Sequence, residues 1–404
     1  MKAFKQVALI SVFCAWWCQA SMADITVKAP DIELKVGARI QPLMYYSDSP
    51  LIADRDVYDF RLRRARFSLV GAMEPGIRVV FQTETAEEPG SASADTRIID
   101  AFLHLNSNQH LQLFAGQFLA PGLRQNVTSA GSLLTMDRPG IVYKSLSWGT
   151  RALTRFSSLT MSNTDVGLRG DVDVRDLGLM LFGSNSEQRQ LNYKYYLAVM
   201  EGAKTAKTER ILLRAQLNWG DAESGQYHNA SYLGDKNTVA VGFNVDQQSK
   251  VAFDSESGED VDYLLSTIDL FVEKPVGAFF YNLEAAWIFL DLDDAAQLAD
   301  YRTGAALSEN AATNAQGQGY YVQSALTVAR RWQPWLAFEA WHSDAEDKAG
   351  SYDALRLGLT YFINGQKANV KLGYELTKAK HAFSTVNGND ESLATVALGF
   401  FITF

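Results

Sequence analysis

The sequence predicts an all-β protein, a closed antiparallel β-barrel that crosses a membrane. Three observations lead to this fold class. Short segments along the chain alternate apolar and polar side chains with a period of two. After residue 23, no run of 18 or more apolar residues is long enough for a membrane-spanning helix. The connections between the alternating segments switch between tight turns and long polar loops, which is typical of outer-membrane barrels.

The first 23 residues have the features of a cleavable signal peptide. Lys2 and Lys5 form a positive start, and a short apolar run covers residues 7–17. Ser21 and Ala23 place small side chains at the −3 and −1 positions of a cleavage site. We therefore predict removal of residues 1–23 and a mature chain, 24–404, that forms one barrel domain.

Cleavage at this position changes the chemistry of the chain. Both cysteines, Cys14 and Cys18, lie in the leader, so the mature protein has no disulfide and no thiolate metal site. Loss of Lys2 and Lys5 leaves 35 basic against 46 acidic residues, a net charge of −11. Such an acidic chain is not expected to bind nucleic acid.

The alternating segments are the expected strands. The same pattern recurs, in chain order, at residues 34–41, 77–82, 99–106, 210–217, 264–273, 355–361 and 367–377. In the last of these, Val370 and Leu372 fall on one face, and Lys371 and Glu375 fall on the other. A helix would mix these two sets, so a strand is favoured. Counting in this way gives about sixteen strands, with weak joins at residues 149–174 and 220–237.

The expected connections fall into two classes. Tight turns are indicated at residues 74–76, 274–277 and 364–366, whereas residues 47–57, 291–317 and 380–390 are long and polar. Aromatic residues near the expected strand ends suggest interfacial girdles. These residues are Trp219, Trp287, Trp335, Trp341, Tyr320, Tyr321 and Tyr361.

The last expected strand ends on an aromatic residue. Val396, Leu398, Phe400, Ile402 and the terminal Phe404 occupy every second position and should face outward. This pattern looks like the C-terminal signal of substrates of the barrel-assembly machinery. We predict recognition by that machinery through Phe404.

Several motifs in the first half of the mature chain carry a family resemblance. In chain order they cover residues 61–67, 115–118, 121–123, 128–129, 134–138, 175–178 and 195–202. The first motif, RLRRARF, is rich in arginine, and the order of the motifs along the chain is what is informative. On these motifs the chain resembles the phosphate-selective porin O and porin P family.

The resemblance implies a sixteen-stranded barrel in the bacterial outer membrane, a third loop folded into the lumen, and a homotrimer. Residues 119–147 are the candidate for that constriction loop, because they form a long segment that follows a strand and carries several charges. The alternative is an ordinary surface loop. Phosphate selectivity does not carry over directly, because the chain is acidic and Met200-Glu201-Gly202 departs from the family pattern.

Charged residues at inward positions suggest a mild anion preference. The predicted anion filter consists of Arg39, Arg64, Arg66, Arg78, Arg124 and Arg138, and the predicted acidic wall opposite consists of Asp269, Glu273 and Glu284. Arginine keeps its charge and presents a planar fork to oxyanions. The alternative is that these charges only hydrate a wet inner wall.

The sequence favours a passive water-filled channel for small hydrophilic solutes, surrounded by outer-membrane lipid. None of the five histidines has metal-site spacing, and no nucleophile elbow or phosphate-binding glycine loop is present. We therefore expect no enzyme activity, metal or cofactor. The alternative function is a barrel that acts as a sheath or scaffold for a partner, such as an electron-transfer protein.

Overall fold

The computed structural model describes residues 25–29, 32–48, 56–73, 76–87, 94–140, 175–185, 190–203, 206–301, 303–304, 315–346, 348, 351–379 and 391–404. The predicted signal peptide and the weak join at 149–174 lie outside these residues. The strands are β1 (Ile25–Ala29), β2 (Ile32–Asp48), β3 (Asp56–Met73), β4 (Ile77–Glu87), β5 (Ala94–Asn108), β6 (Leu111–Leu119), β7 (Arg175–Ser184), β8 (Leu191–Met200), β9 (Arg210–Gly220), β10 (Thr238–Asp254), β11 (Asp260–Val276), β12 (Phe279–Asp291), β13 (Leu298–Ala299), β14 (Gly317–Val328), β15 (Trp332–Ser343), β16 (Tyr352–Asn364), β17 (Ala368–Ala379) and β18 (Glu391–Thr403).

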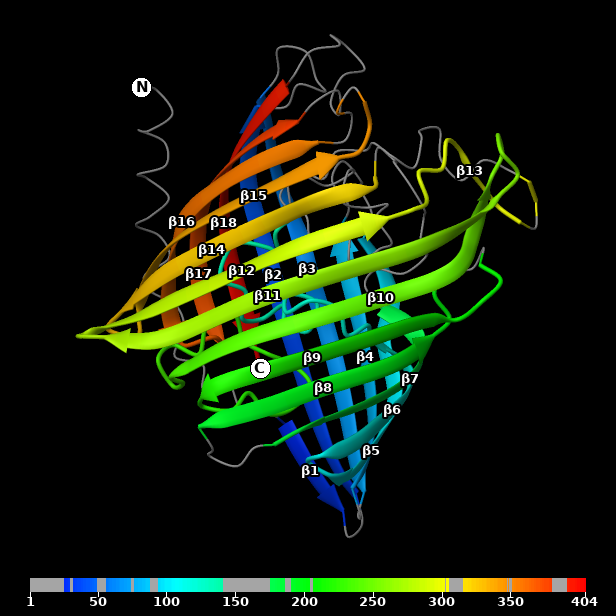
Figure 1. Ribbon diagram of the computed structural model, residues 1–404. Helices are drawn as coiled ribbons and strands as arrows, with labels where there is room; N and C mark the ends of the chain where they lie inside the picture. Colours follow the sequence, from blue (N-terminus) through cyan, green and yellow to red (C-terminus); the bar gives the residue numbers. More distant parts are fainter. Residues whose placement is uncertain are drawn as a thin grey trace.

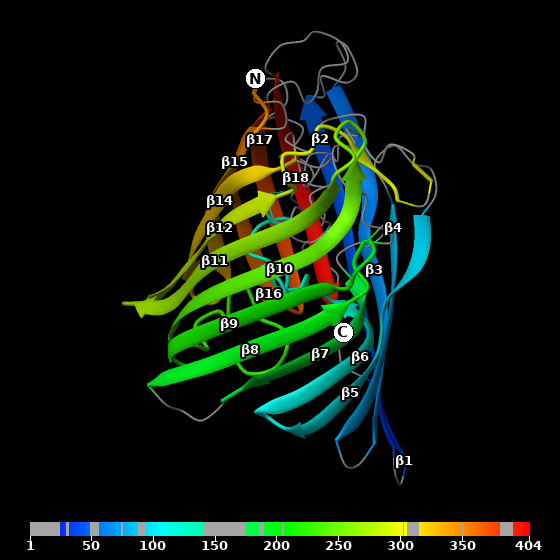
Figure 2. The same ribbon diagram turned by 45° about the vertical axis from the view of Figure 1, so that its right-hand side comes forward.

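Sixteen of these strands form a closed antiparallel barrel (Figures 1 and 2). Each strand pairs with its neighbours in the chain, and β18 pairs with β2 to close the sheet. The terminal Phe404 extends this seam, because its backbone exchanges two hydrogen bonds with Ala38 of β2. Closure leaves no open sheet edge toward lipid, as a membrane-spanning sheet requires. The predicted fold class and strand number are confirmed.

Two short strands lie outside the sixteen. Strand β1 pairs with the first residues of β2, and β13 pairs with the end of β10. Figure 1 shows β1 at the lower tip of the sheet, beside the start of β2. Among the described residues, no helix is long and apolar enough to cross a membrane.

The two faces of the strands follow the predicted alternation. On β17, Leu372 is 45% exposed on the outside, whereas Lys371 and Glu375 are buried on the inside. Leu372 pairs with Leu398 of β18, which also faces outward. Apolar side chains thus cover the outer surface, as contact with the hydrocarbon of the membrane requires.

The aromatic residues divide between the two faces. Trp219 and Trp287 are exposed on the outer surface, and Trp287 stacks on Tyr320 with ring centroids 5.8 Å apart. In contrast, Trp335, Trp341 and Tyr321 are buried on the inner face, so for these three the girdle prediction is wrong. The reason is parity, because each lies at an inward position of its strand.

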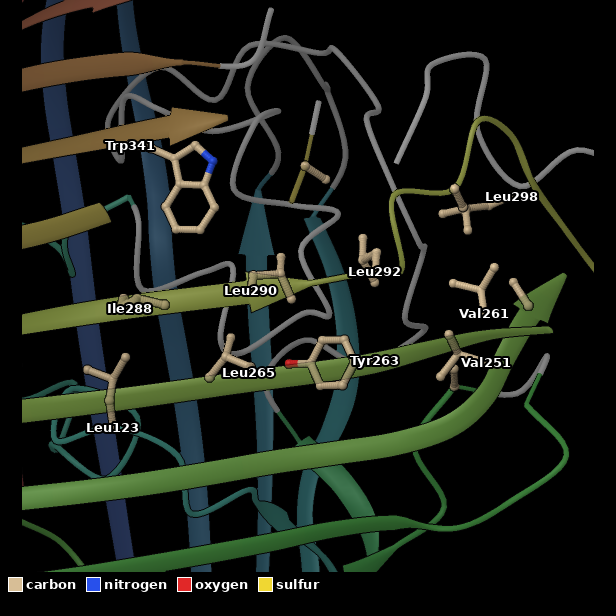
Figure 3. Packing of buried hydrophobic residues seen from close by; sticks show 14 of the residues in the cluster. Leu123, Val251, Val261, Tyr263, Leu265, Ile288, Leu290, Leu292, Leu298 and Trp341 are labelled. Atoms are coloured by element: carbon tan, nitrogen blue, oxygen red, sulfur yellow. The ribbon is translucent and has the colours of Figure 1, made fainter. Parts of the chain in front are cut away.

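An apolar cluster fills part of the inner face of β10–β16 (Figure 3). Trp341 lies above Ile288 and Leu290 of β12, and Leu265 and Tyr263 of β11 lie below them in the view. Leu123, which belongs to the connection after β6, packs into the same cluster. The inner wall in this region is therefore a packed core.

Candidate functional site

The site combines the charged inner wall with two chain segments that contact it. Register places Arg39 of β2 opposite Arg66 of β3, and Arg66 opposite Glu84 of β4, all on the inner face. Arg78 lies on that same face of β4, and its side chain is exposed to solvent. The predicted early-strand cations therefore share one wall.

A β-bulge alters the arginine-rich strand. The register between β2 and β3 shifts between Gln41 and Pro42, so that Arg63 has no partner residue on β2. A bulge re-aims side chains, and here Arg63 and Arg64 both reach Asp137. Arg63 Nε donates to Asp137 at 2.6 Å and Arg64 Nη2 at 2.8 Å. Strict alternation had suggested that Arg63 points away from Arg64.

These ion pairs neutralise part of the predicted filter. Burial would raise the pKa of the Asp137 carboxyl, but the two guanidiniums hold it below its ordinary value. Arg66 Nε donates to Glu84 at 2.6 Å. Arg39 differs, because it donates hydrogen bonds to two hydroxyl groups, Thr403 at 3.1 Å and Ser129 at 3.5 Å.

Asp137 and Ser129 belong to a buried segment, residues 120–140, which follows β6. This segment contacts inward side chains of strands far apart in the barrel. Lys371 of β17 donates to the carbonyls of Leu133, Leu134 and Thr135. Gly140 N donates to Glu339 of β15 at 3.0 Å. Lys144, another charge of the predicted constriction loop, lies outside the described residues.

A second segment, residues 221–237, packs against the first. It connects β9 to β10 at the barrel end that carries the tight turns, whereas the 120–140 segment starts from the opposite end. His228 N donates to Val127 O at 2.8 Å, and Ser129 N donates to His228 O at 2.9 Å. This parallel, strand-like contact joins the two segments.

A buried ion pair fixes this junction. Both terminal nitrogens of Arg124 donate to the Glu223 carboxylate, at 2.8 and 2.5 Å, and both side chains are buried. The Arg124 guanidinium also lies 3.6 Å from the centre of the Phe271 ring. Burial opposes the charge of Arg124, but Glu223 raises the pKa of this guanidinium above its ordinary value.

The predicted acidic wall holds the two segments in place. Asp269 accepts from Arg124 N at 3.0 Å and also pairs with Arg214. Glu273 accepts from the backbone nitrogens of residues 232 and 234, each at 2.8 Å. Glu284 accepts from Gln125 Nε2 at 2.9 Å. These acids therefore bind the inner segments directly.

The last predicted cation, Arg138, is also hydrogen-bonded within the 120–140 segment. Its guanidinium donates to Gln125 O at 2.9 Å and Thr128 O at 2.6 Å.

Sequence reasoning missed Glu223, His228 and Tyr232 altogether. The length of this connection could have indicated them, because 17 residues separate β9 from β10, whereas most connections at that end of the barrel are tight turns. Among the described residues, no group of three metal-ligating side chains is present.

The family model for phosphate-selective porin O and P matches residues 53–404. The chain belongs to this family. It is therefore an outer-membrane porin, and the match supports a channel and not the sheath alternative. Family and fold point to a channel rather than an enzyme. No curated protein sequence matches this porin.

Solved porin structures share the fold of this porin at low identity. The outer-membrane channel DcaP of Acinetobacter baumannii has a TM-score of 0.55 at 13% identity, over 95% of this chain and 100% of DcaP. An anion-selective porin from Comamonas acidovorans gives 0.54 at 12%, over 93% and 100%. In vitro folded OmpT of Vibrio cholerae, described in trimer form, gives 0.51 at 12%, over 93% and 100%.

Proposed function

We propose that this porin is a passive channel for small hydrophilic solutes with a mild preference for anions. The observation that carries this proposal is the unequal exposure of inward charges. Arg78 and Arg97 are exposed, and Arg39 is half-buried. The inward carboxylates Glu84, Asp100, Asp246, Asp269, Glu273, Glu284, Glu339 and Glu375 are all buried, and the half-buried Glu33 of β2 pairs with Lys28 and Lys35. A passing ion therefore meets cations more directly than carboxylates.

The size of the preference follows from the pairing of the arginines. Arg64 and Arg66, two of the six predicted filter residues, form ion pairs with Asp137 and Glu84, so their attraction for a solute is largely offset. Arg78 has no ion pair among the described residues. One or two effective charges in a wet passage give a weak field, which physiological salt screens over about 8 Å.

The test is the reversal potential of the purified porin in a planar bilayer under a potassium chloride gradient. We expect the sign that corresponds to chloride permeating faster than potassium. A potential of the opposite sign would show that the acidic residues dominate and would contradict the anion preference. Absence of conductance in correctly folded protein would contradict the open channel itself.

The 120–140 segment is the proposed constriction, in agreement with the role expected for residues 119–147. Two observations support this role. The segment is buried, and it contacts inward residues of β2, β3, β11, β12, β15 and β17. Charged side chains on such a segment set the field at the narrowest part of a pore. Deletion of residues 128–136 should raise the single-channel conductance, and an unchanged conductance would refute the role.

A homotrimer and a cleaved leader complete the proposal. The trimer is supported by the likeness to OmpT of Vibrio cholerae, which is described in trimer form. Sedimentation of the detergent-solubilised porin should give the mass of three chains. In a planar bilayer, each insertion should raise the conductance in three steps. Sequencing of the mature N-terminus should begin at Asp24, which would establish residues 1–23 as the signal peptide.

A further inference from the structure

A place lined by buried polar side chains lies between the inner wall formed by β8 and β9 and the 221–237 segment. Lys194 and Tyr196 of β8 face inward there, and their register partners on β9 are Gln216 and Arg214. The inner segment covers them, because Tyr196 Oη donates to Gln226 O at 2.6 Å. Every one of these side chains is buried.

Several hydrogen-bond donors at this place have no partner in the described protein. They are Lys194 Nζ, Arg214 Nε and Gln226 Nε2. A buried donor without an acceptor costs about 1–3 kcal/mol, and more when it is charged. Three such residues, on two strands and one segment, call for an explanation such as a bound ion.

Glu223, the carboxylate that attracts Lys194, has no capacity left for it. Oε1 of Glu223 already accepts from Arg124 and from the Tyr232 hydroxyl, each at 2.5 Å. Its other oxygen, Oε2, accepts from Arg124 at 2.8 Å and from Gln216 and Asn218, each at 2.9 Å. A carboxylate offers about four lone-pair sites, so Glu223 is saturated.

The charges around Lys194 are also unbalanced. The groups that interact with it electrostatically are Glu223, which attracts it, and Arg124, Arg214 and Lys236, which repel it. Asp269 offsets Arg214, to which it is bound, and Glu284 lies 4.0 Å from Arg124 Nε. Within the described part of the chain, no carboxylate is hydrogen-bonded to Lys194, whose ammonium nitrogen lies 5.5 Å from the centre of the Tyr196 ring. A buried uncompensated cation is strongly unfavourable.

We propose that this place binds one small inorganic anion, held by Lys194, Arg214 and Gln226. The anion supplies the missing acceptor and the missing negative charge. It is a resident ion and does not permeate, because the surrounding side chains are buried and lie beside the Arg124–Glu223 junction. By bridging the β8–β9 wall and the 221–237 segment, the anion stabilises the segment inside the barrel.

The test is a crystal structure of the full mature porin grown in sodium bromide, with data collected at the bromine absorption edge. A halide gives an anomalous peak within hydrogen-bond distance of Lys194 Nζ. Crystals grown in sodium sulfate form the second arm, in which tetrahedral density would identify an oxyanion site. If the wild type shows neither the anomalous peak nor the tetrahedral density at Lys194, the proposal is overturned.

The variant Lys194→Met removes the cation and keeps most of the side-chain length. We expect the anomalous peak to disappear in this variant and to persist in the control Lys250→Met, which alters an exposed lysine paired with Asp260. A peak that persists in Lys194→Met would mark an adventitious ion only and would overturn the proposal.

A solution measurement on the wild type does not depend on the folding of that variant. Replacing sodium gluconate by sodium bromide at constant ionic strength should raise the Tm of the wild type and of Lys250→Met, because bromide binds only the folded form. A Tm that does not change with bromide or with sulfate would contradict a resident anion. This test is independent of channel selectivity, so its failure leaves the proposed function intact.

Discussion

Arg124 and Glu223 form a bidentate, fully buried ion pair between residues that are 99 positions apart in the chain. One belongs to a segment that enters from the barrel end with long loops, and the other to a segment from the end with tight turns. The pair therefore makes the two inner segments one mechanical unit. Any change in the passage that moves one segment must move the other or break this pair.

Removal of one partner should be costly. We expect Glu223→Ala to lower the free energy of unfolding by about 3–5 kcal/mol, because Arg124 loses its compensating charge in a buried place. The single-channel conductance should rise as the segments separate. The double variant Arg124→Met/Glu223→Leu should recover most of the stability, since an apolar pair replaces an ion pair without leaving a charge.

The exposed pair Arg330–Asp235 provides the matched control. Arg330→Ala should change the unfolding free energy by no more than about 1 kcal/mol, because surface ion pairs contribute little. Denaturant titration in detergent micelles measures the wild type, these variants and the single variants Arg124→Met and Glu223→Leu. Independent, additive effects of Arg124→Met and Glu223→Leu in the double-mutant cycle would contradict the coupling.

The outward face of β17 gives a prediction about the lipid-facing surface. Leu372→Arg should destabilise the folded barrel by about 2–4 kcal/mol if residue 372 lies near the bilayer midplane, because the charge is placed in hydrocarbon. Equilibrium unfolding in lipid vesicles measures this effect. Leu372→Ala is the control for lost packing, and equal effects of Arg and Ala would show that residue 372 does not face lipid.

The sequence predicted the barrel wall well, because the information that sets it is local. The side-chain period of two places Leu372 outside and Lys371 inside whatever the distant chain does. Local alternation failed where one extra residue enters a strand. At the bulge beside Gln41, Arg63 and Arg64 reach the same carboxylate, although consecutive strand residues ordinarily point to opposite faces.

The interior was not predictable in the same way. Arg64 meets Asp137 across 73 positions in the chain, and no period relates the two. The acidic residues Glu273 and Glu284 were expected to line a passage, but their oxygens accept hydrogen bonds from the inner segments. Such contacts depend on how irregular segments fill a closed volume, and sequence patterns carry little information about that.

The C-terminal residue gives a prediction about assembly. Phe404 N donates to Ala38 O at 2.8 Å and Phe404 O accepts from Ala38 N at 2.5 Å, so the last residue completes the seam between β18 and β2. Deletion of Phe404 should reduce the heat-modifiable barrel in the outer membrane and leave protein in the periplasm. Phe404→Tyr, which keeps the ring and the backbone bonds, should assemble normally. Normal assembly of the deletion would contradict recognition by the barrel-assembly machinery through this residue.

His228 gives a prediction about pH. Burial, and then the positive charge of Lys194, lower the pKa of this imidazole from 6.5 to about 3, although Glu223 opposes the shift. Between those pH values the unfolded chain binds a proton at this position that the folded chain does not. The stability of the fold should therefore fall as the pH decreases from about 6.5 to about 3.

The variant His228→Leu should flatten this part of the profile. Thermal unfolding between pH 4 and pH 7 measures the slope, and His110→Gln at the exposed turn after β5 is the control. Equal slopes in the wild type and in His228→Leu would mean that this imidazole does not contribute to the acid sensitivity.

Selectivity should respond most to the arginine that is both inward and exposed. An ion that passes about 6 Å from a unit charge in water interacts with it by about 0.7 kcal/mol. Arg78→Glu reverses that term for both ions, in opposite directions, so it should shift the chloride-to-potassium permeability ratio toward potassium by at most about a hundredfold, and by much less in salt. Arg78→Lys keeps the charge and should leave the ratio nearly unchanged. Arg66→Gln, by comparison, removes a cation that already faces Glu84 at 2.6 Å, and Arg97 at 3.2 Å still pairs with that carboxylate, so it should shift the ratio less than Arg78→Glu does. If reversal potentials showed no response to Arg78→Glu, the passage would not run along the inner face of β4, and the cations there would only hydrate the wall.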